Sequence, residues 1–164
     1  NFKLKILCAK FRPGHFEGVL AVINELLKKI KSKYIFLGEK DYQQAFLINK
    51  FVKKRFMTKV IICKTIRNKF FLPLSSRNNL LNKKQILKSS FVSKSIRKLF
   101  FLIKKNIKNQ NKINKLKYLL KKNNINLEYL EIRNKNNLTS KYNKKNFKIF
   151  VAFHVGKVRL IDNF

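Results

Sequence analysis

Acidic residues, glycine, proline and cysteine are all scarce in this chain. Cys8 and Cys63 are the only cysteines and stand far apart, so the sequence contains neither a zinc-binding motif nor a disulfide framework. We expect both to be small buried apolar residues in a reducing compartment. No apolar run approaches the roughly 18 residues that a membrane-spanning helix needs, and no signal peptide is visible. These absences predict a cytoplasmic protein that does not enter a membrane.

The shortage of acidic residues leaves a large excess of positive charge. Seven Asp and Glu stand against 40 Lys and Arg among 164 residues, which gives a formal net charge of +33. One interpretation is a basic RNA-binding protein of ribosomal type. The other is mutational drift toward A/T-rich codons, because lysine is abundant together with asparagine, isoleucine and phenylalanine while glycine and proline are rare. Lysine is spread over nearly the whole chain rather than gathered on one tail, and this favours drift.

The first part of the chain has the pattern of an α/β fold. Hydrophobic residues make up 45% of the sequence, enough to form a core. Apolar residues at helical spacing predict helices over 17–31 and 41–55, and short apolar runs predict buried strands over 34–37 and 59–63. This helix–strand–helix–strand order is typical of a parallel sheet with crossover helices.

The second part of the chain has a different pattern. Residues 64–79 lose periodicity and are predicted to form a loop, which places a domain boundary near 67–82. The elements predicted beyond it are two basic amphipathic helices within 83–122 that break near Asn109–Asn111, a strand over 127–132, and a hairpin of strands over 147–154 and 158–161.

The mixed-charge turn at residues 38–44 needs a chemical explanation. It follows the first predicted strand and places Glu39 and Asp41, two of the seven acidic residues, on either side of Lys40. Ligands gather at the C-terminal ends of parallel strands, and a lysine there is suited to bind a phosphate. Asp41 is placed either to cap the following helix or to accept hydrogen bonds from ribose hydroxyls. The alternative is a capping aspartate beside a surface lysine.

Other polar residues are candidates for the same chemistry. Ser75, Ser76 and Arg77 place two hydroxyls and a guanidinium on the predicted loop, where they suit the charge of a triphosphate, although an ordinary polar loop is the alternative. His15 lies between a turn and a helix and is either a packed or capping histidine or a substrate contact. His154 lies in a predicted strand, and we expect a structural role for it.

Five ordered motifs resemble the pantothenate synthetase (pantoate–β-alanine ligase) family across nearly the whole chain. They are Arg12-Pro13-Gly14-His15-Phe16-x-Gly18-Val19, Gly38-Glu39-Lys40-Asp41-Tyr42-Gln43-Gln44, Leu74-Ser75-Ser76-Arg77-Asn78, Glu128-Tyr129-Leu130-Glu131-Ile132-Arg133 and Arg159-Leu160-Ile161-Asp162-Asn163. The resemblance implies an α/β fold. A partial Rossmann-like nucleotidyltransferase domain with a parallel sheet is expected over 1–67, followed by a small α+β lid domain with an antiparallel sheet over 68–164.

The resemblance also implies a reaction. The family ligates pantoate and β-alanine to pantothenate in vitamin B5 biosynthesis. ATP with Mg²⁺ is the expected substrate, pantoyl adenylate the intermediate, and pyrophosphate and AMP the released products. A homodimer is expected because the family is typically dimeric, and the partners are small molecules rather than a specific nucleic acid.

Roles for individual residues follow from the same resemblance. Lys40 and Arg77 are the implied catalytic cations, Gln44 is implied to bind pantoate, and His15 lies near the active site. Asp41 is implied near the ribose, and no residue is assigned to a metal. The implied ATP-binding residues are Gly38, Glu39, Lys40, Asp41, Ile66, Leu74, Ser75, Ser76 and Arg77.

The chain also departs from the family pattern. The His-x-Gly-His motif, which carries the family's catalytic histidine, is absent, so the chain resembles the C-terminal portion of the enzyme. Phe70 and Phe71 stand where the family usually has Asp-Gly, and losing that glycine is expected to change how the loop turns. Three alternatives follow: a ligase that needs a further part, a basic RNA-binding protein, and a decayed remnant of the ligase.

Overall fold

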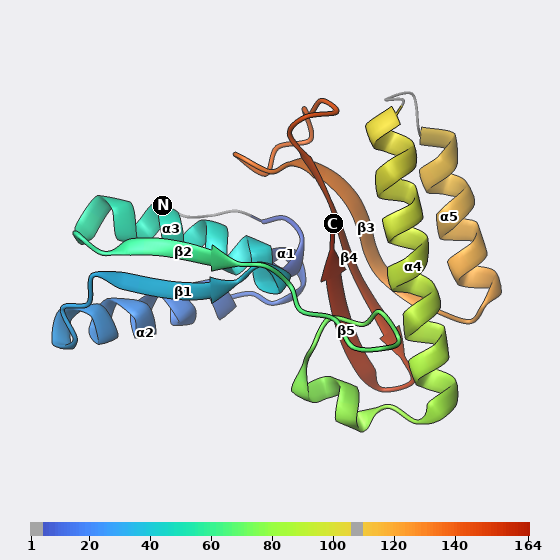
Figure 1. The fold of residues 1–164 in the computed structure, drawn as a ribbon, viewed down its shortest axis with the longest axis horizontal. Helices are drawn as coiled ribbons and strands as arrows, with labels where there is room; N and C mark the ends of the chain where they lie inside the picture. The colour runs from blue at the N-terminus through green and yellow to red at the C-terminus, as the bar shows by residue number, and fades with distance from the viewer. Residues whose placement is uncertain (1–4, 106–109) are drawn as a thin grey trace. The chain divides into compact units, whose positions relative to one another are not determined.

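The computed structural model describes residues 5–105 and 110–164 (Figure 1). The chain divides into two compact units, Asn1–Thr65 and Ile66–Phe164, called here the first and the second unit. A parallel sheet belongs to the first unit and an antiparallel sheet to the second. This is the succession of sheets expected from the sequence, and the predicted fold class is confirmed.

The first unit is built on a two-stranded parallel sheet. The strands pair from Tyr34 opposite Lys59 to Gly38 opposite Cys63, so both end at the same edge of the sheet. A 3₁₀ turn, η1, follows directly after the first strand at that edge. The elements of this unit are α1 (Cys8–Phe11), α2 (His15–Lys29), β1 (Tyr34–Gly38), η1 (Glu39–Asp41), α3 (Tyr42–Arg55) and β2 (Lys59–Cys63).

Helices α2 and α3 cover one face of the parallel sheet, and Figure 1 shows them running alongside its strands. Each helix carries basic residues in its last turn, where positive charge is favourable beside the negative end of the helix dipole. Leu37 and Val60 of the sheet pack on the core that the helices form. That core consists of Leu20, Leu27, Ile48, Phe51 and Val52.

The opposite face of the β1–β2 sheet is open. Phe36 is 67% exposed and Tyr34 is 50% exposed, and Ile61, which pairs with Phe36, is exposed as well. Parallel sheets are ordinarily covered on both faces and read as continuous apolar runs for that reason. The first unit therefore displays apolar side chains that a complete parallel α/β layer would bury.

The second unit is a three-stranded antiparallel sheet covered by two helices. The strand order is β3-β4-β5, with a shift in register between Leu127 and Tyr129 on β3. A hairpin around Gly156 joins the last two strands, as the sequence predicts. The elements of this unit are η2 (Ser76–Leu80), α4 (Lys83–Lys105), α5 (Gln110–Lys122), β3 (Asn126–Asn134), β4 (Phe147–Val155) and β5 (Val158–Asn163).

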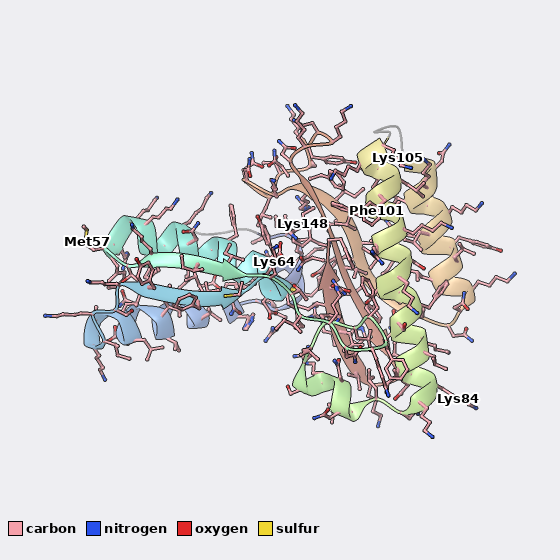
Figure 2. The ribbon with its side chains drawn as sticks, viewed as in Figure 1. Met57, Lys64, Lys84, Phe101, Lys105 and Lys148 are labelled. Carbon is pink, nitrogen blue, oxygen red and sulfur yellow. The ribbon has the colours of Figure 1, made fainter. Side chains whose placement is uncertain are left out.

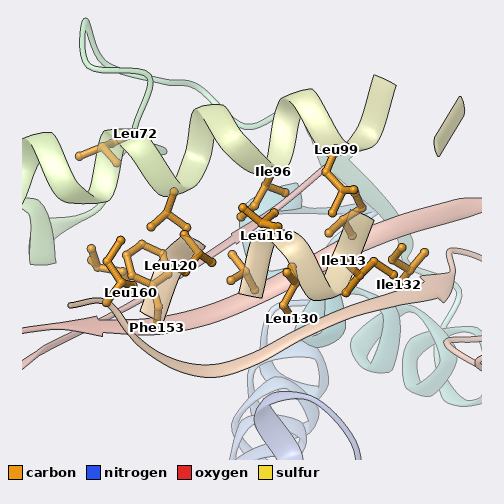
Figure 3. Close-up of a cluster of buried hydrophobic side chains, with 14 of the residues drawn as sticks. Leu72, Ile96, Leu99, Ile113, Leu116, Leu120, Leu130, Ile132, Phe153 and Leu160 are labelled. Atoms are coloured by element: carbon orange, nitrogen blue, oxygen red, sulfur yellow. The ribbon is translucent and has the colours of Figure 1, made fainter. Parts of the chain in front are cut away.

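The core of the second unit lies between α4, α5 and one face of this sheet (Figure 3). Ile96 and Ile103 of α4 and Leu120 of α5 have no exposed surface, and Ile149 and Val151 of β4 are equally buried. Burying such side chains contributes roughly 1.5–3 kcal/mol each, so this cluster is a principal source of stability for the unit.

Lysines occupy the outer surfaces of the same helices. Figure 2 shows Lys84 and Lys105, near the two ends of α4, extending away from the ribbon. The amphipathic pattern that predicts these helices therefore separates an apolar core face from a solvated basic face. The predicted break near Asn109–Asn111 falls partly outside the described residues, and α5 begins at Gln110.

Some sequence expectations were incomplete or wrong. The expectation that both cysteines are buried holds for Cys8 but is wrong for Cys63, which is exposed at the end of β2. Cys63 pairs with Gly38 at the last position of the sheet. Helix α1 was not predicted, because four residues carry too little periodicity to be read. The predicted loop over 64–79 contains an isolated bridge between Arg67 and Pro73 and the start of η2.

Candidate nucleotide-binding site

The predicted site residues fall into two groups, one on each unit. The first group follows β1, where Gly38 is extended and the chain then tightens into the 3₁₀ turn η1. Because β1 and β2 are parallel, this turn lies at the carboxyl ends of the strands, where α/β folds bind ligands. Gly38, Glu39, Lys40 and Asp41 are therefore brought together by local backbone geometry alone.

Asp41 does not cap the helix that follows it. It occupies the N-cap position of α3, but its side chain makes no capping hydrogen bond. The carboxylate instead lies 3.5 Å from the Lys40 ammonium nitrogen. The capping interpretation is therefore not supported by the structure, and the turn presents an ion pair of two neighbouring residues.

The two consecutive glutamines of α3 have different surroundings. Gln44 is half-buried, one helical turn beyond Lys40. Gln43 is only 5% exposed, and its Nε2 donates to the Ile6 carbonyl oxygen at 2.9 Å. Its Oε1 is buried and finds no hydrogen-bond partner among the described residues. Sequence reasoning did not single out Gln43; the available signal was that it lies three residues before Phe46 and four before Leu47, at the helical spacing of the apolar face.

The histidines lie in separate places. His15 is the first residue of α2, after Gly14 in the left-handed conformation, and its ring lies 5.0 Å from the Phe16 ring. His154 lies on β4, and its buried Nδ1 has no hydrogen-bond partner within the described parts of the chain. The expectation that His154 has a structural role stays a prediction.

The second group of site residues lies on the segment that opens the second unit. The Leu74 amide donates to the Ile66 carbonyl oxygen at 2.9 Å, which places these two predicted ATP contacts side by side. Ser75 Oγ accepts a hydrogen bond from the Arg77 amide at 3.3 Å and starts η2. Arg77 is exposed, and its Nη1 donates to the Arg159 carbonyl oxygen of β5 at 3.0 Å.

Phe71 adopts a backbone conformation that favours glycine. Its φ is 67°, in the left-handed region, which costs an ordinary L-residue roughly 1–2 kcal/mol. Its ring lies 5.8 Å from that of Phe164 and near the guanidinium groups of Arg67 and Arg97, at 4.7 and 5.1 Å. These contacts stabilise the strained residue, and the expectation that losing the family's glycine changes how the loop turns stays a prediction.

Neither a metal centre nor a membrane helix is evident in the described part of the chain. No group of three or more His, Cys, Asp or Glu gathers there in a metal-binding arrangement. Among the same residues, every helix is too short or too polar to cross a lipid bilayer. The side chains of the two groups include cations, hydroxyls and amides, which suit an anionic ligand.

Comparison with known proteins identifies relatives over nearly the whole chain. The sequence profile of pantoate–β-alanine ligase matches residues 3–164. A pantothenate synthetase of Francisella tularensis subsp. mediasiatica is 42% identical over 97% of this chain and 53% of its own length. The synthetase of Francisella tularensis subsp. novicida is 41% identical over the same shares. The chain thus spans about half the length of the curated relatives it matches.

Solved structures give the same result. The pantoate–β-alanine ligase of Francisella tularensis, crystallised with βγ-ATP and β-alanine, is 39% identical and superposes with a TM-score of 0.77 over 98% of this chain and 54% of its own. The pantothenate synthetase of Thermus thermophilus shares the fold, with a TM-score of 0.80, 24% identity, and coverage of 98% and 59%. None of these relatives supports the RNA-binding interpretation.

Proposed function

Because the chain belongs to the pantoate–β-alanine ligase family, we propose that it supplies one part of an ATP-dependent enzyme that joins pantoate to β-alanine. The observation that carries the proposal is the Lys40–Asp41 turn at the carboxyl end of a parallel strand. The ATP and β-alanine bound to the Francisella relative support the same substrates here. The cytoplasm as its location and a homodimer as its assembly belong to the same proposal.

The reaction takes two steps. A carboxylate oxygen of pantoate attacks the α-phosphorus of ATP, and the bond to the bridging oxygen breaks, so that pyrophosphate leaves with the electron pair. The product is pantoyl adenylate. The amine of β-alanine then attacks its acyl carbon, AMP leaves, and the nitrogen loses a proton as the amide of pantothenate forms. ATP enters as its Mg²⁺ complex, with the ion as part of the substrate.

The residues of the first unit bind the reacting groups. Lys40 offers its ammonium to the phosphates, whose negative charge grows as pyrophosphate departs. Asp41, which already faces Lys40, accepts hydrogen bonds from the ribose hydroxyls. Gln44 lies one turn along α3 and binds pantoate through its amide. His15 contributes a further polar group. Positioning and charge stabilisation by these groups account for the expected catalysis.

The residues of the second unit bind the triphosphate. Ser75 and Ser76 supply hydroxyl donors, and Arg77 supplies a guanidinium with five N–H donors, of which Nη1 contacts the Arg159 carbonyl. Leu74 belongs to the same loop over the triphosphate, and Ile66 offers its backbone to the adenine. Since the catalytic histidine motif of the family is not in these residues, the proposal requires a further polypeptide segment to complete the site.

A complementation assay tests the proposal. The 164-residue chain is mixed with the part of the Francisella synthetase that it does not match, and AMP release is measured with pantoate and β-alanine present together or singly. We expect AMP release that depends on both substrates. Lys40→Ala is expected to reduce it by about 100-fold or more, because it removes the cation on the phosphates.

Lys33→Ala is the matched control. Lys33 precedes β1 at its other end, so the same substitution there is expected to leave AMP release unchanged. Soluble, folded chain that associates with the added part but releases no AMP would support the decayed-remnant alternative. Equal loss of activity in the two lysine variants would contradict the assignment of Lys40.

A further inference from the structure

Asp162 of β5 is the centre of a buried polar network outside the groups assigned above. Its side chain is 1% exposed, and Arg67 binds both carboxylate oxygens, with Nη1–Oδ2 and Nη2–Oδ1 distances of 2.9 and 2.8 Å. Ser93 Oγ donates to Oδ2 at 2.7 Å, and the Asn163 amide donates to Oδ1 at 2.7 Å. A buried carboxylate with this many donors is held firmly in one orientation.

Arg67 connects this network to the turn that precedes the Ser-Ser-Arg segment. Its Nη1 also donates to the Phe71 carbonyl oxygen at 3.0 Å. Its guanidinium lies 4.7 Å from the ring centre of Phe71 and 4.2 Å from that of Phe164. The left-handed residue Phe71 is therefore held through both its backbone and its ring. Arg67, Phe71, Asp162 and Phe164 together are called the Arg67 anchor.

The turn itself is closed by hydrogen bonds on either side of Phe71. The Phe71 amide donates to the Asn68 carbonyl at 2.8 Å, and the Asn68 amide donates to the Leu72 carbonyl at 2.9 Å. Asn68 Oδ1 accepts from the amides of Phe70 and Leu72, each at 3.0 Å. Only Pro73 separates this turn from Leu74, so the direction in which the Leu74–Arg77 segment leaves is fixed by the turn.

The other end of the segment is attached to the same strand. Arg77 Nη1 donates to the Arg159 carbonyl of β5, and Asn78 Nδ2 donates to the Pro73 carbonyl, both at 3.0 Å. The Leu74–Arg77 segment is thus connected to β5 at both ends. The turn before it is held to Asp162 through Arg67, and Arg77 contacts Arg159 directly. The connection through Asp162 is a buried ion pair, and the connection to Arg159 is an exposed hydrogen bond.

We propose that Arg67 and Asp162 are positioning residues that hold the Leu74–Arg77 segment in the conformation that binds the triphosphate. The inference rests on the proposed function of that segment and adds the contacts of Arg67 and Asp162 that order it. A segment that is already ordered loses less conformational entropy when its ligand binds. The competing explanation is that the ion pair only stabilises the fold of the second unit.

Hydrogen exchange of the complete chain separates these explanations. The probes are the hydrogen-bonded amides of Leu74, Arg77 and Asn78, compared with amides of β4. Asp162→Asn keeps the shape of the side chain but removes its charge. We expect exchange at the three probes to rise about tenfold while that of β4 changes little. An unchanged rate at the probes, or an equal rise across the whole unit, would overturn the proposal.

Glu131→Gln is the matched control within the same unit. Glu131 pairs with Arg133, whose Nη1 donates to the carbonyl of Leu138, another residue with positive φ, at 3.0 Å. The control thus removes a more exposed acid from another arginine–acid pair, whose arginine also binds the carbonyl of a residue with positive φ on a different loop. Exchange at the Leu74, Arg77 and Asn78 probes is expected to stay at the parent rate. A matching rise in this variant would count against a specific role of Asp162.

Phe71→Gly keeps the experiment decisive if Asp162→Asn does not fold. Glycine adopts the same positive φ but removes the ring that packs on Arg67 and Phe164. Faster exchange at the three probes, with β4 unaffected, supports the anchor. Parent-like exchange overturns it.

ATP titration distinguishes failure of the anchor from failure of the proposed function. In the parent chain mixed with the part of the Francisella synthetase that it does not match, ATP is expected to slow exchange at the probes, and Arg77→Ala is expected to remove this effect. Asp162→Asn is expected to weaken ATP binding about tenfold while pantoate binding, assigned to the first unit, stays unchanged. Absence of any ATP effect in the complemented parent chain would overturn the function proposed for the segment, whereas the ATP-free exchange rates of the chain alone still decide on the anchor.

Discussion

At the scale of single residues, Tyr42 has an environment that predicts a pH dependence. Burial raises the pKa of Tyr42 above 10.0, and the nearby Glu39 carboxylate adds a smaller rise. The folded state therefore holds the phenolic proton more tightly than the unfolded state does. This contribution to stability is complete below the unfolded pKa near 10 and is lost as the pH rises from there through the folded pKa.

Tyr42→Phe removes this titration. We expect the free energy of unfolding of the parent chain to fall more steeply between about pH 9 and 11 than that of the variant, because only the parent has the shifted phenol. Urea unfolding at a series of pH values measures both slopes, and lysine titration affects both proteins alike. Parallel slopes would show that Tyr42 titrates as it does in the unfolded chain.

Sequence patterns located the candidate segments better than they predicted the contacts of individual side chains. The turn from Gly38 to Asp41 and the Ser75–Arg77 segment were both located from residue chemistry. Whether Asp41 caps its helix, or whether Cys63 is covered, depends on contacts that no local pattern contains. The left-handed conformation of Phe71 is the clearest case, because it depends on Arg67 and on a ring at the far end of the chain.

At the scale of elements, helix α4 begins with a reciprocal cap. Asn82 Oδ1 accepts from the Gln85 amide, and Gln85 Oε1 accepts from the Asn82 amide, both at 2.9 Å. Asn82→Ala is therefore expected to lower the free energy of unfolding by about 1 kcal/mol. Chemical denaturation measures the change. Asn79→Ala, an exposed asparagine of η2, is the control and is expected to cost less; equal losses would contradict the capping role.

Elements with strong periodicity were predicted closely, and short ones were missed. Strand β2 has the predicted bounds, Lys59–Cys63, and α3 begins one residue after the predicted start. The 3₁₀ geometry of η1 and η2 was not predicted, because three to five residues carry too little periodic signal. Strand β3 extends beyond its prediction at both ends, since pairing with β4 continues into polar residues.

At the scale of the whole molecule, the open face of the β1–β2 sheet makes the first unit asymmetric. Phe36→Lys on that face is expected to change the free energy of unfolding by less than about 1 kcal/mol and to reduce binding of a hydrophobic dye. Leu37→Lys, one residue further along β1 but packed on the helical core, is expected to cost more than about 2 kcal/mol. Equal losses in thermal or urea unfolding would mean that both faces are covered.

The exposed Cys63 gives this chain a built-in place for a probe. Cys8 is buried, so a thiol-reactive dye is expected to attach at one position in the folded protein. That position pairs with Gly38, directly before the turn that carries Lys40 and Asp41. A fluorophore on Cys63 would report on ligand binding at this edge of the sheet without any engineered cysteine. Unfolding would be measured by a second, slower labelling at Cys8.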